Sequence, residues 1–185
     1  MTTHAIDGCA GMEPADDGRR SLDVMCDEIV ERYHAALRRS LPRIRDELAH
    51  LYATATSPGI LRLATAFGEL AELIEAHLAK EENLLFPALE ALANAERMGR
   101  SRPPLPFVTV LHPIRLMEAE HVRIELALDR LRELVLAVSE PDTLSASWHQ
   151  CMADLSHLDD DLREHHRTEN EHLFPQALEL ERRIL

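Results

Sequence analysis

Residues 77–90 read HLAKEENLLFPALE and residues 165–179 read HHRTENEHLFPQALE, and these two stretches decide the fold. Each contains His-x-x-x-Glu, followed by Leu-Phe-Pro at the same offset from the histidine. A further histidine precedes each stretch at nearly the same distance, at His34 and at His121. This arrangement indicates an internal duplication, in which each half supplies one helix with a core histidine and one helix with a histidine and a glutamate.

Apolar residues around these motifs recur at steps of three and four, the pattern of a helix with one face toward a bundle core. The predicted inward-facing stripes are Val30, His34, Leu37, Leu41, Ile44, Leu48 and Leu51; Leu63, Leu70, Ile74, His77, Glu81, Leu84 and Ala88; Ile114, Met117, His121, Ile124, Leu128, Leu131, Val135 and Val138; and Trp148, Cys151, Leu155, Leu158, Leu162, His165, Glu169, Leu173 and Ala177. Four such helices joined by turns predict an all-α, antiparallel up-down four-helix bundle built from a duplicated two-helix unit.

The chain divides into a short tail and one helical domain. Residues 1–20 contain Gly, Pro and Asp without a periodic apolar pattern, so we expect a flexible N-terminal tail. The bundle is expected over 21–185, with halves 21–97 and 113–185 joined by the proline-rich loop 98–112. Within the first helix, Pro42 is expected to kink or restart the helix.

Composition excludes several classes of partner. The formal net charge is −13, from 20 basic and 33 acidic residues, so the surface repels nucleic acids and anionic lipid. No apolar run is long enough to span a bilayer, and the acidic N-terminus does not resemble a signal peptide. Three cysteines, an odd number in no paired motif, favour a reducing compartment. We therefore expect a cytoplasmic protein, with Cys26 and Cys151 as small core residues.

The histidines and glutamates on the stripes predict a metal centre. Residues four apart on a helix share a face, so His77 with Glu81, and His165 with Glu169, point inward together with His34 and His121. Such a set of buried carboxylates and imidazoles needs a compensating partner. Imidazole with carboxylate suits iron, and also manganese or zinc. Two irons bridged by Glu81 and Glu169 are the favoured interpretation, with coordination positions left for O₂ or NO.

Other titratable residues receive weaker interpretations. Glu31 and Glu118 lie three residues before His34 and His121, where we expect them to accept hydrogen bonds from imidazole N–H groups, with Glu120 a further candidate. His50 is off the stripe and expected to face solvent, whereas His172 could approach the edge of the site. Surface or capping positions are expected for His4, His112, His149, His157 and His166.

Four stretches resemble a known family: IVERYHAALRRSLPRI at 29–44, HLAKEENLLFPAL at 77–89, HPIRLMEAEH at 112–121 and DLREHHRTENEHLFPQAL at 161–178. The order His, His-x-x-x-Glu, His, His-x-x-x-Glu is similar to that of the hemerythrin-like (HHE domain) di-iron proteins. Arg-Tyr-His with Leu-Pro after it, and Pro-Ile before Met-Glu-x-Glu-His, resemble the iron–sulfur cluster repair branch of that family.

The resemblance implies terminal iron ligands at His34, His77, His121 and His165, with Glu81 and Glu169 as bridges. It implies a non-haem di-iron centre that helps to restore iron–sulfur clusters after nitrosative or oxidative stress, with NO reduction as a possible enzymatic activity and iron–sulfur proteins as partners. The chain differs from typical members in having only Cys9 in place of a cysteine-containing N-terminal domain. It also has Ala55, with His50 off the stripe, where many members carry a further histidine.

Two other hypotheses remain open at the level of sequence. A hemerythrin that binds O₂ reversibly, for storage or sensing, would use every one of the same ligands. A metal-free interaction bundle would use none of them. The identity of the metal in the cell, the client protein and the oligomeric state do not follow from these residues.

Overall fold

The structure is a computed structural model that describes residues 20–138 and 145–185. Almost all of the expected flexible tail, 1–20, lies outside the described residues. The elements in chain order are α1 (Leu22–Ile29), η1 (Val30–His34), α2 (Ala35–Ala55), α3 (Pro58–Lys80), η2 (Glu81–Leu85), α4 (Phe86–Arg97), α5 (Leu111–Ala137), α6 (Ser145–Thr168), η3 (Glu169–Leu173) and α7 (Phe174–Arg183). The three η elements are π-helical turns of five residues each.

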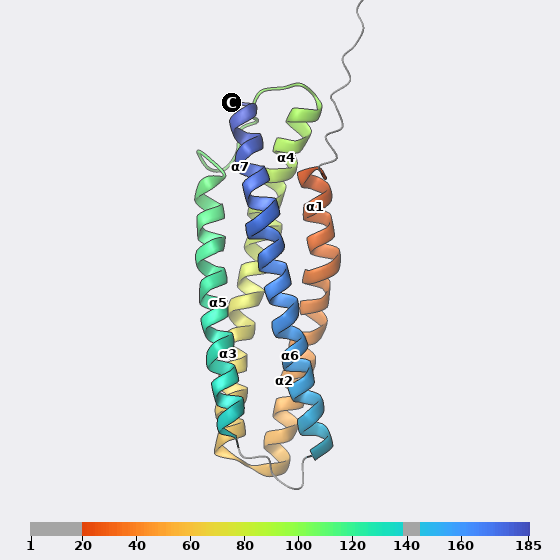
Figure 1. Ribbon diagram of the computed structural model, residues 1–185, viewed down its shortest axis with the longest axis vertical. Helices are drawn as coiled ribbons and strands as arrows, with labels where there is room; N and C mark the ends of the chain where they lie inside the picture. The colour runs from red at the N-terminus through yellow and green to blue at the C-terminus, as the bar shows by residue number, and fades with distance from the viewer. Residues whose placement is uncertain (1–19, 139–144) are drawn as a thin grey trace, which may run out of the picture.

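Because each π-helical turn joins two α-helices without a gap, the described elements form four continuous rods. These rods are α1–η1–α2, α3–η2–α4, α5, and α6–η3–α7, and they lie side by side along the long axis of the molecule (Figure 1). The prediction of an all-α four-helix bundle is therefore confirmed. None of the helices in the described ranges is long and apolar enough to cross a membrane.

The helix around Pro42 does not restart. α2 continues from Ala35 to Ala55 through this proline. Proline removes one backbone hydrogen bond from a helix interior. Leu37, Leu41 and Ile44, on both sides of Pro42, are each at most 1% exposed, so core packing holds the helix together across the missing bond.

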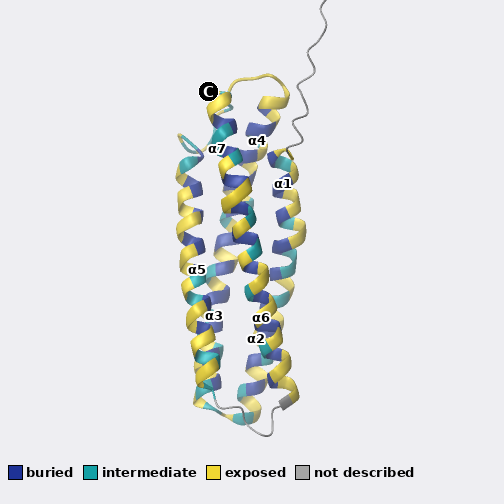
Figure 2. Ribbon diagram, viewed as in Figure 1, coloured by how far each residue is buried: buried dark blue, intermediate teal, exposed yellow. Residues whose placement is uncertain are grey.

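The interior consists of two apolar clusters. One is built around Leu41, Phe67 and Leu158 at the end of the bundle where α2 meets α3. The other is built around Ile29, Phe86 and Phe174, near α1, α4 and α7. Buried faces point inward and exposed faces outward along all four rods (Figure 2). The predicted metal-ligating residues lie in sequence between the members of the two clusters, so they form a polar layer between two apolar ones.

The connection between the two halves is fastened to the last helix. It follows α4, which ends at Arg97, and α5 begins at Leu111. Glu181 of α7 accepts hydrogen bonds from Arg102 Nε (2.8 Å), Thr109 Oγ1 (2.6 Å) and the buried backbone N–H of Val110 (3.2 Å). One carboxylate thus anchors the proline-rich segment beside the end of the bundle that holds α4 and α7.

Candidate metal centre

The structure brings the six side chains predicted as metal ligands into one layer of the bundle. They come from all four rods: His34 from η1, His77 from α3, Glu81 from η2, His121 from α5, His165 from α6 and Glu169 from η3. None of them is more than 1% exposed. The helix faces predicted from the sequence therefore converge, and the layer is shielded from solvent.

The first group of donors contains His34, Glu81, His165 and Glu169. The Nε2 atom of His34 lies 3.3 Å from Oε2 of Glu81 and 3.3 Å from Nε2 of His165. The same His165 nitrogen lies 3.3 Å from Oε1 of Glu169. One donor atom from each of the four residues lies within 4.8 Å of all the others.

The second group uses the same two glutamates with His77 and His121. Oε1 of Glu81 lies 3.2 Å from Nε2 of His77, and Oε2 of Glu169 lies 3.2 Å from Nε2 of His121. Each carboxylate therefore turns one oxygen toward each group. With metal–ligand bonds of about 2.1 Å, neighbouring ligands around a metal lie about 3 Å apart, which matches these separations.

The buried polar atoms of the layer that lack hydrogen-bond partners fit a pair of divalent cations. Both oxygens of Glu81 and of Glu169, and Nε2 of His77 and of His121, are buried without a hydrogen-bond partner. Burying carboxylates in this way is strongly unfavourable unless a cation neutralises them. Two imidazoles and two carboxylate oxygens at each position suit iron, manganese or zinc, whereas calcium requires oxygen ligands alone.

Neighbouring side chains fix the imidazoles by binding their Nδ1 atoms. Nδ1 of His34 lies 2.6 Å from Glu82 Oε1, and Nδ1 of His77 lies 3.3 Å from Glu120 Oε2. Nδ1 of His121 lies 3.1 Å from Asn170 Oδ1. A hydrogen bond at Nδ1 leaves the lone pair on Nε2, the atom that faces the centre, so these contacts select the tautomer needed for a metal ligand.

These contacts correct part of the sequence-based interpretation. Glu120 has the predicted role, but the side chains of Glu31 and Glu118 are exposed. His34 and His121 bond instead to Glu82 and Asn170, the residues that directly follow Glu81 and Glu169. This pair was not predicted, although the repeat contains a signal for it: a carboxylate or amide side chain follows the glutamate in both halves.

The π-helical turns explain how each glutamate and the residues after it stay on the inward face. His77, Glu81, Leu85 and Leu89 are buried at steps of four, as are their counterparts from His165 to Ala177. In an α-helix three such steps would rotate the last side chain by about 120°, and the wider π turn absorbs this drift. The prediction that Leu84 faces the core is therefore wrong: it is 40% exposed, and Leu85 is buried.

Proline follows two of these turns, at Pro87 and Pro175, in the first turn of α4 and of α7. A proline lacks the N–H group of a regular helix, and its ring clashes with the carbonyl one turn earlier. A widened turn relieves this clash. The repeated Leu-Phe-Pro thus marks the position of the π turn in each half.

Comparison with known proteins identifies a family that binds cations, in agreement with the His/Glu layer described above. The model of the hemerythrin HHE cation-binding domain matches residues 26–102, which include His34, His77 and Glu81. An iron–sulfur cluster repair protein YtfE from Edwardsiella ictaluri is 33% identical over 162 residues, covering 85% of this chain and 66% of that protein. The chain belongs to the hemerythrin-like family.

Two further relatives have the same name. The iron–sulfur cluster repair proteins YtfE of Escherichia coli O157:H7 and of Escherichia fergusonii are each 29% identical over 173 residues. These alignments cover 90% of this hemerythrin-like chain and 71% of each relative. The chain thus spans about two thirds of the length of the curated relatives it matches. Its family membership, together with the His/Glu groups, implies cation binding in this layer.

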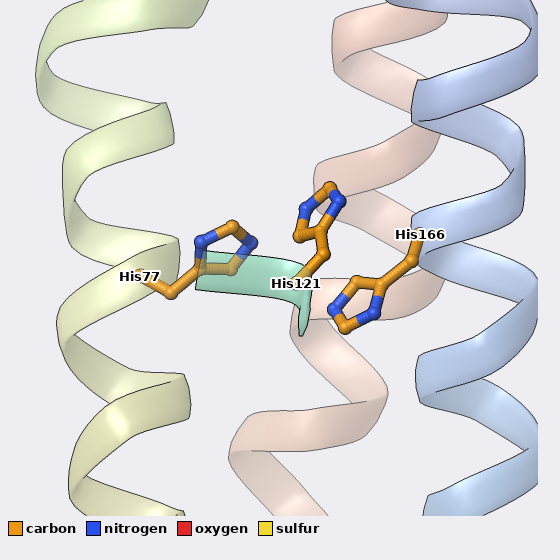
Figure 3. A group of neighbouring side chains, drawn as sticks. All are labelled: His77, His121 and His166. Atoms are coloured by element: carbon orange, nitrogen blue, oxygen red, sulfur yellow. The ribbon is translucent and has the colours of Figure 1, made fainter. Parts of the chain in front are cut away.

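The hemerythrin-like layer contains one histidine that the sequence analysis placed wrongly at the surface. His166 of α6 is 2% exposed, and its ring stacks on that of His121, with centroids 4.0 Å apart and planes 13° apart. Figure 3 shows the two rings beside His77. Adjacent residues of a helix point about 100° apart, but a rod packed against neighbours on two sides buries a stripe wide enough for both His165 and His166.

Two other histidines lie outside the layer. His50 is exposed, as predicted. His172 is also exposed, and it lines a small cavity of about 180 Å³ together with Tyr33 and Thr168. The Tyr33 ring stacks on His165 at a centroid distance of 5.5 Å, and its hydroxyl lies 3.3 Å from that of Thr168. Tyr33 therefore separates this cavity from the His34–His165 side of the centre.

In the metal-free layer, the buried carboxylates and imidazoles shift one another's pKa values. Burial opposes the charged form of Glu169, but the nearby imidazoles of His165 and His121 hold the pKa of Glu169 well below its ordinary value. Burial likewise opposes protonation of His77, yet the close carboxylate of Glu81 raises the pKa of His77 to about 8. For His166, burial and the neighbouring His121 and His165 lower the pKa to about 2, so its ring is neutral.

The two described cysteines take no part in the centre. Cys26 and Cys151 are buried free thiols, as predicted. Burial, followed by the charge of Glu47, raises the pKa of Cys151 to about 12. Burial also raises the pKa of Cys26. Both are therefore small core side chains rather than nucleophiles or metal ligands.

Proposed function

We propose that this hemerythrin-like chain is a non-haem di-iron protein that acts in the repair of iron–sulfur clusters damaged by nitrosative or oxidative stress. His34, His77, His121 and His165 would hold the irons through their imidazoles, and Glu81 and Glu169 would supply carboxylate oxygens to both. The observation that carries this proposal is the pair of buried carboxylates that each turn one oxygen toward each of two imidazole pairs. The names of the relatives supply the biological context.

The residues of the chain have three tasks in this function. The six ligands hold the metal pair, and Glu82, Glu120 and Asn170 orient three of the imidazoles through Nδ1. The apolar clusters on both sides keep bulk water out of the layer. When bound, the irons would supply redox chemistry and free coordination positions for NO or O₂. We place the protein in the cytoplasm, where its thiols would stay reduced, with iron–sulfur proteins as its partners.

The first test is the metal content of protein purified without oxygen. We expect close to two irons per chain. Two manganese or zinc ions would keep the site but remove the redox function. Negligible metal that persists after anaerobic loading with Fe(II) would overturn the proposal.

The second test distinguishes repair from oxygen carriage. A [4Fe–4S] protein damaged by NO should regain its cluster in the presence of the iron-loaded chain, and a variant with both Glu81→Ala and Glu169→Ala should give no recovery. Adding NO to the reduced protein and measuring nitrous oxide tests for reductase activity. A stable, reversible O₂ complex without cluster recovery would instead favour an oxygen-binding protein.

A further inference from the structure

His166 is a buried polar residue that the six-ligand set leaves unexplained. Both of its ring nitrogens are buried and have no hydrogen-bond partner. The carboxylate of Glu125 lies 4.0 Å from Nδ1, which is too far for a hydrogen bond, and the Glu125 side chain is 44% exposed. A neutral imidazole with two unsatisfied nitrogens in a dry layer is unfavourable unless something else binds it.

The position of the ring indicates what binds it. One nitrogen each of His77, His121 and His166 lie within 4.8 Å of one another, and all three residues are buried. In Figure 3 the three side chains come from three separate rods and meet in the same space. His77 and His121 also form the second donor group with Glu81 and Glu169. The ring of His166 is closest to that of His121, with centroids 4.0 Å apart, so it lies beside that group.

Packing alone does not account for this histidine. Its ring stacks on His121, a contact that any flat aromatic side chain could make. An apolar ring would make the same contact without burying two unpaired nitrogens. The choice of histidine therefore points to a use for the lone pair.

We propose that His166 is a seventh metal ligand, which joins His77 and His121 so that one metal position has three imidazoles and the other, at His34 and His165, has two. This inference rests on the proposed di-iron function. For six-coordinate metals bridged by both glutamates, one free position remains at the three-imidazole metal and two at the other.

The test uses His166→Phe, which keeps an aromatic ring against His121 but has no lone pair, and His166→Ala. His157→Ala, an exposed histidine on the same helix, is the matched control. Each full-length protein is stripped of metal and titrated anaerobically with ⁵⁷Fe(II) against a competing chelator. Bound iron is counted per chain, and Mössbauer spectra are recorded. Urea unfolding of the metal-free proteins checks that every variant folds.

We expect two irons with clearly different quadrupole doublets in the wild type and in His157→Ala. In both His166 variants one iron should bind at least tenfold more weakly, and the two doublets should become alike. Metal-free His166→Phe should be at least as stable as the wild type, because it lacks the unpaired nitrogens. If His166→Phe binds both irons with wild-type affinity and spectra, the inference is overturned while the di-iron function stands. A wild type that does not bind two irons would overturn both.

Discussion

Nδ1 of His34 lies 2.6 Å from Oε1 of Glu82, and Arg38 holds the same carboxylate at 2.7 Å through both of its oxygens. The guanidinium and the imidazole hold the pKa of Glu82 below its ordinary value against the opposing effect of burial. An ionised Glu82 accepts a hydrogen bond from Nδ1–H of His34, which leaves the lone pair on Nε2, the atom that faces the metal layer. Glu82, which is outside the proposed ligand set, thus orients one of the proposed ligands.

Replacing Glu82 with Ala should weaken metal binding without removing a ligand. Loss of such an orienting carboxylate typically lowers metal affinity by about 10- to 100-fold. We expect an effect of this size at one of the two metal positions, measured by anaerobic Fe(II) titration against a chelator. Glu72→Ala, an exposed residue on α3, should leave both affinities unchanged. An equal loss in both variants would assign the effect to general destabilisation.

Removing the metal should lower the stability of the bundle. A ligand present at about 1,000 times its dissociation constant stabilises the folded state by about 4 kcal/mol. We expect the urea midpoint of the iron-loaded protein to fall on chelation, and Glu81→Ala and Glu169→Ala each to abolish the difference between loaded and stripped protein. A metal-free interaction bundle predicts the opposite pattern, with no response to chelator.

The pH dependence of the metal-free protein should change in His166→Phe. The pKa of His166 is about 2 in the folded state and about 6.5 in the unfolded chain, so protons favour unfolding as the pH falls from 6.5 toward 2. Lowering the pH from 7 to 5.5 should therefore cost about 1 kcal/mol through this residue. His77 on α3 and His165 on α6 have raised pKa values and act in the opposite direction, because their protonation stabilises the folded state.

The test compares how strongly the free energy of unfolding depends on pH in two metal-free proteins, the wild type and His166→Phe. Free energies of unfolding in urea at pH 7 and 5.5 should fall more steeply for the metal-free wild type than for metal-free His166→Phe, since only the wild type contains this histidine. Parallel dependences in the two proteins would contradict the assigned protonation state of His166.

Glu181→Ala should destabilise the end of the bundle that holds the connecting segment. The change leaves the buried N–H of Val110 without its partner and releases Arg102 and Thr109. Leaving one buried donor unsatisfied costs about 1–3 kcal/mol. Urea unfolding should show a loss in this range, whereas Glu171→Ala at an exposed site should show little.

Glu181 should also make the stability of the fold sensitive to acid. Burial opposes its ionisation, but Thr109, Arg102 and the Val110 N–H hold the pKa of Glu181 below 4.5. A carboxylate with a depressed pKa stabilises the fold above its unfolded-state pKa, and this contribution disappears as the pH falls through the folded-state value. The difference in stability between wild type and Glu181→Ala should therefore shrink below about pH 4.5.

The sequence predicted the bundle and the convergence of six side chains because the duplication repeats both. Periodicity identifies which side of a helix faces inward, but it assumes an ideal α-helical turn. A π turn contains about one residue more than an α-helical turn, so the inward-facing position moves from Leu84 to Leu85. Hydrophobicity likewise does not distinguish His166 from a surface histidine, since its burial depends on how closely two neighbouring rods approach α6.

The hydrogen-bond partners of Nδ1 of His34 and His121 could not be predicted from the sequence, for a different reason. Glu31 and Glu118 precede their histidines by one helical turn, and a partner on the same helix is the simplest expectation from sequence. The actual partners, Glu82 and Asn170, lie on other rods. Only the relative placement of the rods decides which polar side chain reaches an imidazole nitrogen.

Each donor group draws on both halves of the duplicated chain. Glu81 comes from the first half and Glu169 from the second, and each group needs one oxygen from each of them. A polypeptide equal to one half could therefore never assemble the centre alone, but two copies of it could do so as a symmetric pair. The covalent link between the halves thus places both carboxylates in a single chain, where the two halves differ in the residue that follows, Glu82 in one and Asn170 in the other.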